Sequence, residues 1–312
     1  MLGKTAGGLF WMFRYLERSE NTARLLETGL RMALTRSSGN EDWGSLVQTA
    51  GVVDGFNERH DETTMDNVVD FLLRDRSNPS SVVSMMESAR SNARLVRTAL
   101  TPEVWEATNE CWMAVMAALK RPVSAKDLPE VLGLVRQQSA LVRGALHGTM
   151  LRNDVYNFSR LGTFIERADS TARILDVKYY TLLPSAGAVG SRLDNTQWET
   201  ILRSVSAHRA FRWLDEAEMS PLSIANFLIF DERLPRSLLF CCQKAAENLQ
   251  HLDRTYGQTH ECQTLALELT KRLQSTSITQ VFETGLHEFL VAFLAQNNAV
   301  AGQIERCYRF AE

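Results

Sequence analysis

Apolar residues recur at spacings of three and four along almost the whole chain. This spacing is typical of helices that bury one face. Short β-branched stretches in strict alternation with hairpin turns are not found, so no sheet is predicted. The pattern predicts an all-α fold, a helical bundle of about 10–12 helices. The expected helices are 9–35, 42–59, 63–74, 79–99, 102–120, 128–150, 154–183, 195–217, 221–230, 235–253, 258–275 and 279–310.

Several of these boundaries have a local cause. Asn78-Pro79 and Thr101-Pro102 each place a capping residue before a proline, which suits the first position of a helix. Pro184 is expected to end the long helix that begins at residue 154. The small residues 185–191 follow, and this stretch is predicted to be a flexible linker.

The sequence repeats itself internally. The pattern E-R-x-[ED]-x-T-A-R-[LI]-L-[ED] occurs at 17–27 and again 149 positions later. Three matched blocks in the same order are hard to obtain by chance. The two further blocks are 43–47 with 198–202, at an offset of 155, and 71–83 with 227–239, at an offset of 156.

This repeat predicts how the chain is organised. We expect one domain, residues 1–312, built from two similar helical halves, 1–150 and 151–312. Neither half is expected to be an independent domain, because both are expected to share one core. The halves are predicted to pack about a pseudo-twofold axis.

The repeated segment carries a charged stripe beside an apolar one. In each copy a glutamate and the arginine seven positions later share one helical face. Partly buried charges need partners. If the copies pack antiparallel, Glu17 is expected to pair with Arg173, and Arg24 with Glu166. The residues of this motif, with a binding or a structural role, are Glu17, Arg18, Arg24, Glu166, Arg167 and Arg173.

Three interpretations of these stripes remain open: a structural network of ion pairs, a site for a ligand or partner, and direct catalysis. The paired acids Glu17/Glu20 and Glu166/Asp169 could in principle hold a metal. No histidine accompanies them and arginines share their face, so neither a metal nor a cofactor is expected.

A second stripe places Arg90, Arg94 and Arg97 on one helical face. Three arginines in a row can bind phosphate or carboxylate groups, so they form a candidate anion-binding ridge. The alternative is a solvated face that pairs with acids such as Glu87. The ridge is confined to one half, because the corresponding residues of the other are Ala246, Gln250 and Asp253.

Charge and composition exclude several classes of protein. A net charge of −3 and a pI near 6.1 argue against a nucleic-acid-binding protein. No apolar run approaches the roughly 20 residues of a membrane span, so no membrane association is expected. The five cysteines are odd in number and irregularly spaced, which indicates reduced thiols in a cytoplasm.

Other candidate chemistry is sparse. No motif of a P-loop, a zinc protease or a serine hydrolase is found. His208 and His251 are expected to be packed or at the surface rather than catalytic. Trp43 and Trp198 occupy matched positions of the repeat and are expected to anchor the core.

Several longer motifs point to one family. They are GLFWMFRYLERSENTAR at 8–24, ARSNARLVR at 89–97, TMLR at 149–152, RLGTFIERAD at 160–169, ILDVKYY at 174–180 and FLIFDERLPRS at 227–237. With these motifs, nearly the whole chain resembles the alpha-E family, bacterial all-helical proteins named for a Glu-Arg motif. The chain departs from the family at 153–157, where it has NDVYN in place of a Glu-Gly-Trp-like stretch.

The resemblance implies partners rather than a reaction. Alpha-E proteins are typically encoded beside, or fused to, an ATP-grasp-like ligase of circularly permuted type. A transglutaminase-like protein is often nearby, and in some bacteria a proteasome-like peptidase. The family is thought to act in peptide synthesis or modification, and it supplies no settled catalytic residues.

We therefore expect a non-catalytic helical partner of an ATP-grasp-like ligase, which binds that ligase or its peptide substrate. The first alternative is an enzyme subunit whose Glu/Arg cleft contributes directly to amide-bond formation. The second is a binding protein for an anionic small molecule.

Overall fold

The computed structural model describes residues 1–35, 41–180, 192–214 and 219–311. Within these residues the regular structure is helical and contains no strand, so the predicted all-α class is confirmed. The predicted linker 185–191 lies outside them. Besides one turn of 3-10 helix at Arg97–Ala99, the described helices are α1 Gly3–Thr35, α2 Glu41–Ala50, α3 Val53–Asn57, α4 Met65–Leu73, α5 Val82–Leu95, α6 Pro102–Ala118, α7 Leu128–Thr149, α8 Asp154–Tyr180, α9 Arg192–Ser204, α10 His208–Phe211, α11 Pro221–Phe230, α12 Leu238–Tyr256, α13 Glu261–Ser275, α14 Ile278–Thr284 and α15 Leu286–Cys307.

The described part of the chain has 15 α-helices, more than the number predicted, because the backbone breaks three expected helices. Gly51 follows α2 with φ 70°, Ser206 lies between α9 and α10 with φ 57°, and Gly285 separates α14 from α15 with φ 108°. A residue with positive φ cannot continue a right-handed helix. The spacing of apolar residues continues across each break, so it predicted longer helices.

The start of α5 also differs from the prediction. Asn78 does not cap a helix at Pro79; its side-chain amide donates to the carbonyl of Phe71 at 3.0 Å. The helix begins at residue 82, where the Ser81 hydroxyl accepts a hydrogen bond from the Ser84 amide at 3.2 Å. The predicted start of α6 at Pro102 is confirmed.

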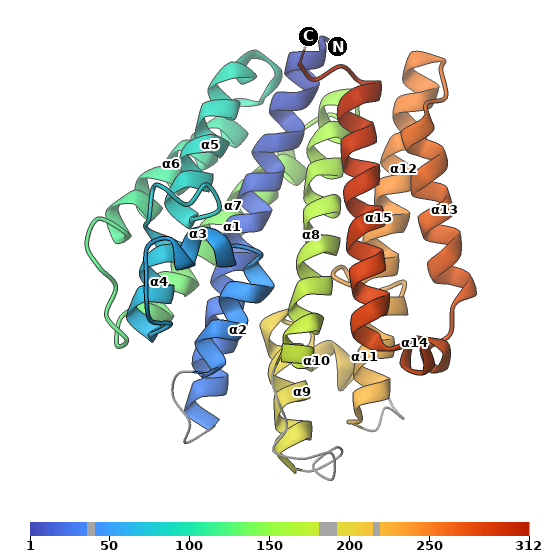
Figure 1. The fold of residues 1–312 in the computed structure, drawn as a ribbon. Coiled ribbons are helices and arrows are strands. Elements are labelled where there is room, and N and C mark those ends of the chain that lie inside the picture. Colours follow the sequence, from blue (N-terminus) through green and yellow to red (C-terminus); the bar gives the residue numbers. More distant parts are fainter. Residues whose placement is uncertain (36–40, 181–191, 215–218, 312) are drawn as a thin grey trace.

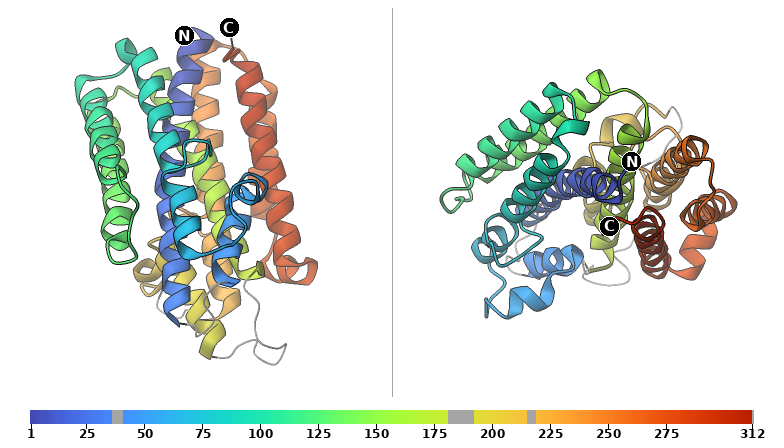
Figure 2. Two further views of the ribbon diagram at one scale, coloured as in Figure 1. Left: turned by 60° about the vertical axis from the view of Figure 1, so that its left-hand side comes forward. Right: turned by 90° about the horizontal axis from the view of Figure 1, so that it is seen from above.

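Helices α1 and α8 lie side by side at the centre of the molecule (Figure 1). Helices α5, α6 and α7 lie on the side of α1, and α12, α13 and α15 on the side of α8, which is clear in the view from above (Figure 2). Helices α2 and α9 each contact both central helices. The two chain ends meet at one end of the bundle (Figure 1).

The two central helices run parallel, so the predicted antiparallel packing of the repeated segments is wrong. The side-chain amide of Asn21 donates to the Ser170 hydroxyl at 2.6 Å, which pairs positions 149 residues apart. Near the other end of the interface, Gly162 approaches the α1 backbone so closely that a Cβ there would overlap the carbonyl oxygen of Phe10. This close approach brings polar side chains of both helices into one buried interface.

Buried apolar side chains from both halves form one continuous core. Trp43 and Trp198 are 2% and 3% exposed, which confirms that both anchor this core. The single domain, the duplication of the halves and their pseudo-twofold axis stay predictions. Among the helices that the structure describes, none combines the length and the apolar character needed to cross a bilayer.

Candidate functional site

Two glutamates lie at the interface of α1 and α8, and each is held by an arginine of the other helix. Glu17 accepts from Arg167 Nε and Nη2 at 2.8 and 2.9 Å. Glu166 accepts from Arg18 Nε and Nη2 at 2.5 and 2.8 Å. Both pairs are bidentate, the strongest geometry between arginine and a carboxylate.

The prediction that the glutamate of each repeated segment pairs with an arginine of the other segment is therefore correct. The two arginines that were predicted as partners, Arg173 and Arg24, are wrong. In a parallel pair in register, the arginine next to each glutamate lies level with the glutamate of the other helix. An arginine seven residues further on is about 10.5 Å away along the axis. Arg24 instead pairs with Glu20, and Arg173 with Asp169.

Further arginines converge on the same interface. Arg236, from the turn before α12, lies 3.2 Å from Glu17 and 2.5 Å from Glu20. Arg143 of α7 contacts both of these glutamates, and Arg14 lies 2.9 Å from Glu166. The Glu-Arg cluster, as used below, consists of Glu17, Glu20, Glu166, Arg14, Arg18, Arg24, Arg143, Arg167 and Arg236.

Sequence reasoning missed Arg14, Arg143 and Arg236 as members of this cluster. The sequence could have pointed to Arg236, since it lies within a repeated block where the matching residue, Ser80, is uncharged. Nothing in the sequence pointed to Arg143, because the contact between α7 and α1 is visible only in the tertiary structure.

Electrostatics keep the cluster glutamates ionised. Burial alone would raise the pKa of Glu17, but the guanidinium groups of Arg167, Arg143 and Arg236 outweigh it and hold that pKa well below its usual value. Glu166 is also buried, and Arg14 and Arg18 lower its pKa. Both carboxylates are poor proton acceptors near neutral pH.

Positive charge is in excess within the cluster, with six guanidinium groups for three carboxylates. Arg236 shows the consequence. Burial and the nearby charges of Arg24 and Arg167 lower its pKa to about 10, against the attraction of Glu17. The guanidinium group still stays protonated at neutral pH.

Arg24 and Arg173 fasten the flanking helices to the central pair. Arg24 Nη1 donates to the carbonyl of Ser204 at 2.9 Å, at the end of α9. Arg173 Nη1 donates to the carbonyl of Thr49 at 3.3 Å, near the end of α2. Each contact lies two residues before a backbone position with positive φ. Arg24 binds the chain before Ser206, and Arg173 binds it before Gly51.

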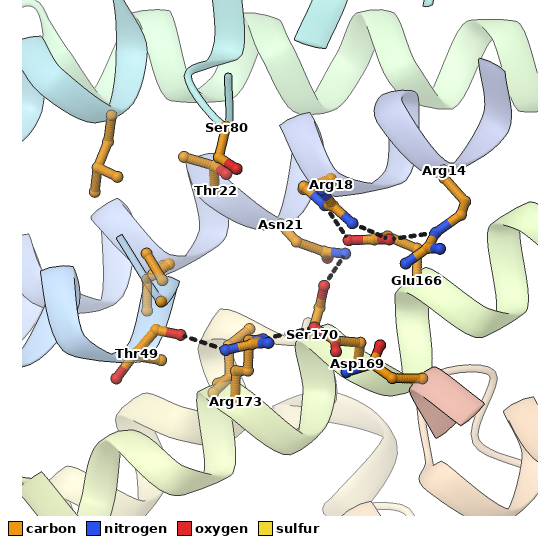
Figure 3. A pocket seen from close by; sticks show the side chains of 16 residues that line it. Arg14, Arg18, Asn21, Thr22, Thr49, Ser80, Glu166, Asp169, Ser170 and Arg173 are labelled. Carbon is orange, nitrogen blue, oxygen red and sulfur yellow. Dashed lines mark hydrogen bonds and ion pairs between the residues drawn. The ribbon is translucent and has the colours of Figure 1, made fainter. Parts of the chain in front are cut away.

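A cavity of about 240 Å³ lies on the Glu166 side of this interface (Figure 3). Ser80 and Thr22 lie opposite Thr49 and Arg173 across this space. Its other charged lining residues are Arg14, Arg18, Glu166 and Asp169. The cavity thus combines donors and acceptors within a small polar space.

The predicted anion-binding ridge is mostly packed. Arg90 stacks on Trp112 at 3.9 Å from the ring centroid, and Arg97 stacks on Trp105 at 5.1 Å. Arg94 is exposed. The acid expected as a partner, Glu87, forms an ion pair with Arg76 instead. Arg90 therefore joins α5 to α6, Arg97 joins the following 3-10 turn to α6, and Arg94 is left for other contacts.

A basic groove that the sequence did not predict lies near the ends of α1 and α9, with a volume of about 860 Å³. Four separate segments supply its side chains, so no sequence motif could reveal it. Among the described residues, Glu27 is the acidic side chain that lines this groove, and Trp213 is 72% exposed at it. The basic lining residues are Arg31, Arg136, Arg203, His208, Arg209 and Arg212.

Other chemistry is limited in the part of the chain that the structure describes. No group of three or more histidine, cysteine, aspartate or glutamate side chains there could hold a metal ion. Burial raises the pKa of the Cys111 and Cys241 thiols to about 12. These thiols are therefore poor nucleophiles.

A family model described as a predicted alpha-helical domain with a conserved ER motif matches residues 1–308. The chain belongs to the Alpha-E family. The Glu-Arg pairs at 17–18 and 166–167, which face each other across α1 and α8, are of the kind that this description names.

The Alpha-E chain is also similar to longer bacterial proteins. Uncharacterised proteins of Mycobacterium bovis and of two strains of Mycobacterium tuberculosis are each 24% identical to it over 309 residues. The match covers 92% of this chain but only 34% of each relative, so this chain spans about a third of their length. No solved structure matches the chain.

Proposed function

We propose that this chain is a non-catalytic helical partner of an ATP-grasp-like ligase in a bacterial peptide-synthesis or peptide-modification system. It binds the ligase or the ligase's peptide substrate. The observation that carries the proposal is the relative length of the mycobacterial proteins, in which this domain takes up about a third of one polypeptide. A domain joined to a larger neighbour in relatives is expected to work beside it here as well.

The chemistry of the Glu-Arg cluster supports a non-catalytic role. Glu17 and Glu166 are each 1% exposed and each is bonded to at least two arginines. Their lowered pKa values make them weak bases. The cluster therefore suits holding α1 and α8 together in a fixed geometry for binding.

The test is association with an ATP-grasp-like ligase of circularly permuted type, taken from the same organism as this chain. The tagged chain is mixed with that protein and analysed by affinity capture and size-exclusion chromatography. Co-elution as a stoichiometric complex is expected, and ATP-dependent ligation should depend on the complex. Separate elution at micromolar concentrations of both proteins would contradict the proposal.

The same assay separates the alternative of an enzyme subunit. Glu166→Gln is compared with wild type for complex formation, helical content and ligation. Loss of ligation in a folded, complex-forming variant would favour a direct role of the Glu/Arg cleft in amide-bond formation. Retained ligation favours the non-catalytic partner.

The basic groove favours a second candidate function, the binding of an anionic small molecule. Three of its five arginines are paired, Arg31 and Arg136 with Glu27 and Arg203 with Glu199. Arg209 and Arg212 add positive charge to the groove, and arginine binds phosphate and carboxylate groups in a bidentate manner. Calorimetric titration with tripolyphosphate tests this. Arg209→Ala/Arg212→Ala is expected to abolish binding, whereas Arg90→Ala/Arg94→Ala on the ridge serves as the comparison that locates the site.

We further propose that the protein acts in the cytoplasm. All five cysteines are free of disulfide bonds, and four of them are buried. Free thiols persist in a reducing compartment. Cell fractionation followed by immunoblotting checks this location.

A further inference from the structure

The cavity beside Glu166 has a filled counterpart on the other side of the α1–α8 interface. There, Arg236 enters from the turn before α12 and donates to Glu20 at 2.5 Å and to Asn21 at 3.2 Å. In the matched blocks 71–83 and 227–239, the position of Arg236 is occupied by Ser80. Ser80 lines the cavity, so a short hydroxyl stands where the other side has a guanidinium group.

The second arginine of the filled side is also missing at the cavity. Arg143 reaches the filled side from α7, which packs on α1. Helices α12 and α15 pack on α8, and α15 lines the cavity with Asn298. Where the filled side holds Arg143 and Arg236, the cavity is lined by the shorter, uncharged side chains of Ser80 and Asn298.

Acceptors remain unused around the cavity. Asp169, which corresponds to Glu20, is 7% exposed; its Oδ2 accepts from Arg173 at 2.6 Å. Its Oδ1 accepts no hydrogen bond from the residues that the structure describes. Glu20, by contrast, faces three arginines. The buried hydroxyl of Thr49, which also lines the cavity, has no hydrogen-bond partner within the described chain. A carboxylate oxygen without a hydrogen bond and a buried hydroxyl without a partner favour a ligand that brings donors.

We infer that this cavity binds a guanidinium group of a ligand, such as an arginine side chain or a free alkylguanidine. The planar, five-donor fork fits a site whose acceptors include the carboxylate of Asp169 and the unpartnered hydroxyl of Thr49. About 240 Å³ is below the roughly 300–1,000 Å³ of drug-sized sites, so it suits one side-chain head. The inference goes beyond the proposed function and requires no ligase.

The filled side shows that the interface accommodates one more cation than the cavity side holds. The filled side holds four arginines against Glu17 and Glu20, whereas the cavity side holds three against Glu166 and Asp169. A bound guanidinium gives the cavity side the same excess of two positive charges that the filled side already carries. The four arginines of the filled side are Arg24, Arg143, Arg167 and Arg236.

The test is calorimetric titration of the full chain with agmatine, an alkylguanidine, and with glutarate as the anionic comparison. Agmatine is expected to bind with a millimolar or lower dissociation constant and glutarate is not. Asp169→Asn, which keeps the shape of the side chain, is expected to weaken agmatine binding about tenfold or more. No agmatine binding to wild type, unchanged binding to the variant, or glutarate binding lost in that variant would each overturn the inference.

A second variant fills the cavity with a side chain of the protein itself. Ser80→Arg places an arginine at the position that matches Arg236, and it is expected to abolish agmatine binding while the protein keeps its helical content. Ser91→Arg adds the same residue at an exposed position of α5 outside the cavity and is expected to leave binding unchanged. Equal agmatine binding by both folded variants would overturn the inference. If Ser80→Arg does not fold, Asp169→Asn decides alone.

Discussion

At the scale of single residues, the core of this protein holds ionised side chains because each is matched to several partners. Glu17 faces Arg167, Arg143 and Arg236. Desolvation of a carboxylate costs several kcal/mol, and bidentate hydrogen bonds with additional charges offset that cost. Removing one member therefore leaves its partners buried and uncompensated.

Glu17→Gln is expected to lower the free energy of unfolding by about 3–5 kcal/mol, because the buried Arg167 and Arg236 and the partly buried Arg143 lose their counter-charge. Urea unfolding followed by circular dichroism measures the loss. Glu87→Gln is the matched control, since Glu87 pairs with Arg76 at the surface and its removal should cost at most about 1 kcal/mol. Equal losses in the two variants would contradict the interpretation of the cluster.

The stability difference between wild type and Glu17→Gln should also depend on pH. The pKa of Glu17 is lower in the folded than in the unfolded chain, so its ionised form stabilises the fold above the unfolded pKa of about 4.3. This contribution is lost as the pH falls through the folded pKa. Urea unfolding should show a constant difference between pH 7 and about pH 5.5 and a shrinking one below about pH 4.5. A difference that stays constant down to pH 3 would be inconsistent with this account.

At the scale of elements, α1 and α8 pack backbone against backbone. Gly162 lies against the backbone of α1, where a Cβ would overlap Phe10 O and lie 3.3 Å from Arg14 N. This contact sets the spacing of the two helices and with it the reach of the arginines across the interface. The register of the cluster therefore depends on a residue that carries no charge.

Gly162→Ala is expected to destabilise the protein by about 1–3 kcal/mol or more, because the helices must separate to admit the methyl group. Gly144→Ala in α7 meets nothing within 4 Å and should be neutral or stabilising by up to about 1 kcal/mol. Thermal unfolding of both variants measures the contrast. A Gly162→Ala protein as stable as Gly144→Ala would show that α1 and α8 can shift without cost.

At the scale of the whole molecule, the two predicted halves meet through their most buried helices. Every residue of 161–172 in α8 is buried, and this segment faces α1 and the flanking helices α12 and α15. A half without its partner would expose both this apolar surface and the charges of the Glu-Arg cluster.

Residues 1–150 expressed alone are therefore expected not to fold cooperatively. The fragment should lack a sigmoidal thermal transition, and co-expression with residues 151–312 should restore a stable complex. Circular dichroism and size-exclusion chromatography check both outcomes. A cooperatively folding, monomeric 1–150 fragment would show that the halves are independent domains.

The sequence alone determined the helical class, most helix positions and the two Glu-Arg pairs, 17–18 and 166–167, at the centre of the molecule. Helical spacing is local, so it predicted α11 at its observed bounds and the buried positions of Trp43 and Trp198. It could not reveal the breaks at Gly51 and Ser206, because a single positive φ leaves the apolar spacing unchanged.

Only the tertiary structure decided which charges meet. The sequence indicated candidate arginine partners for Glu17 and Glu166, but it did not reveal the relative direction of the two helices. Because the helices are parallel, the partners are Arg167 and Arg18, and Arg143 and Arg236 reach the same interface from distant elements. The cavity beside Asp169 depends on the same choice, since it exists where side chains from several parts of the chain, among them α1, α2, α8 and α15, do not fill the space. Pairing of buried charges depends on distances between elements, and a linear pattern does not contain those distances.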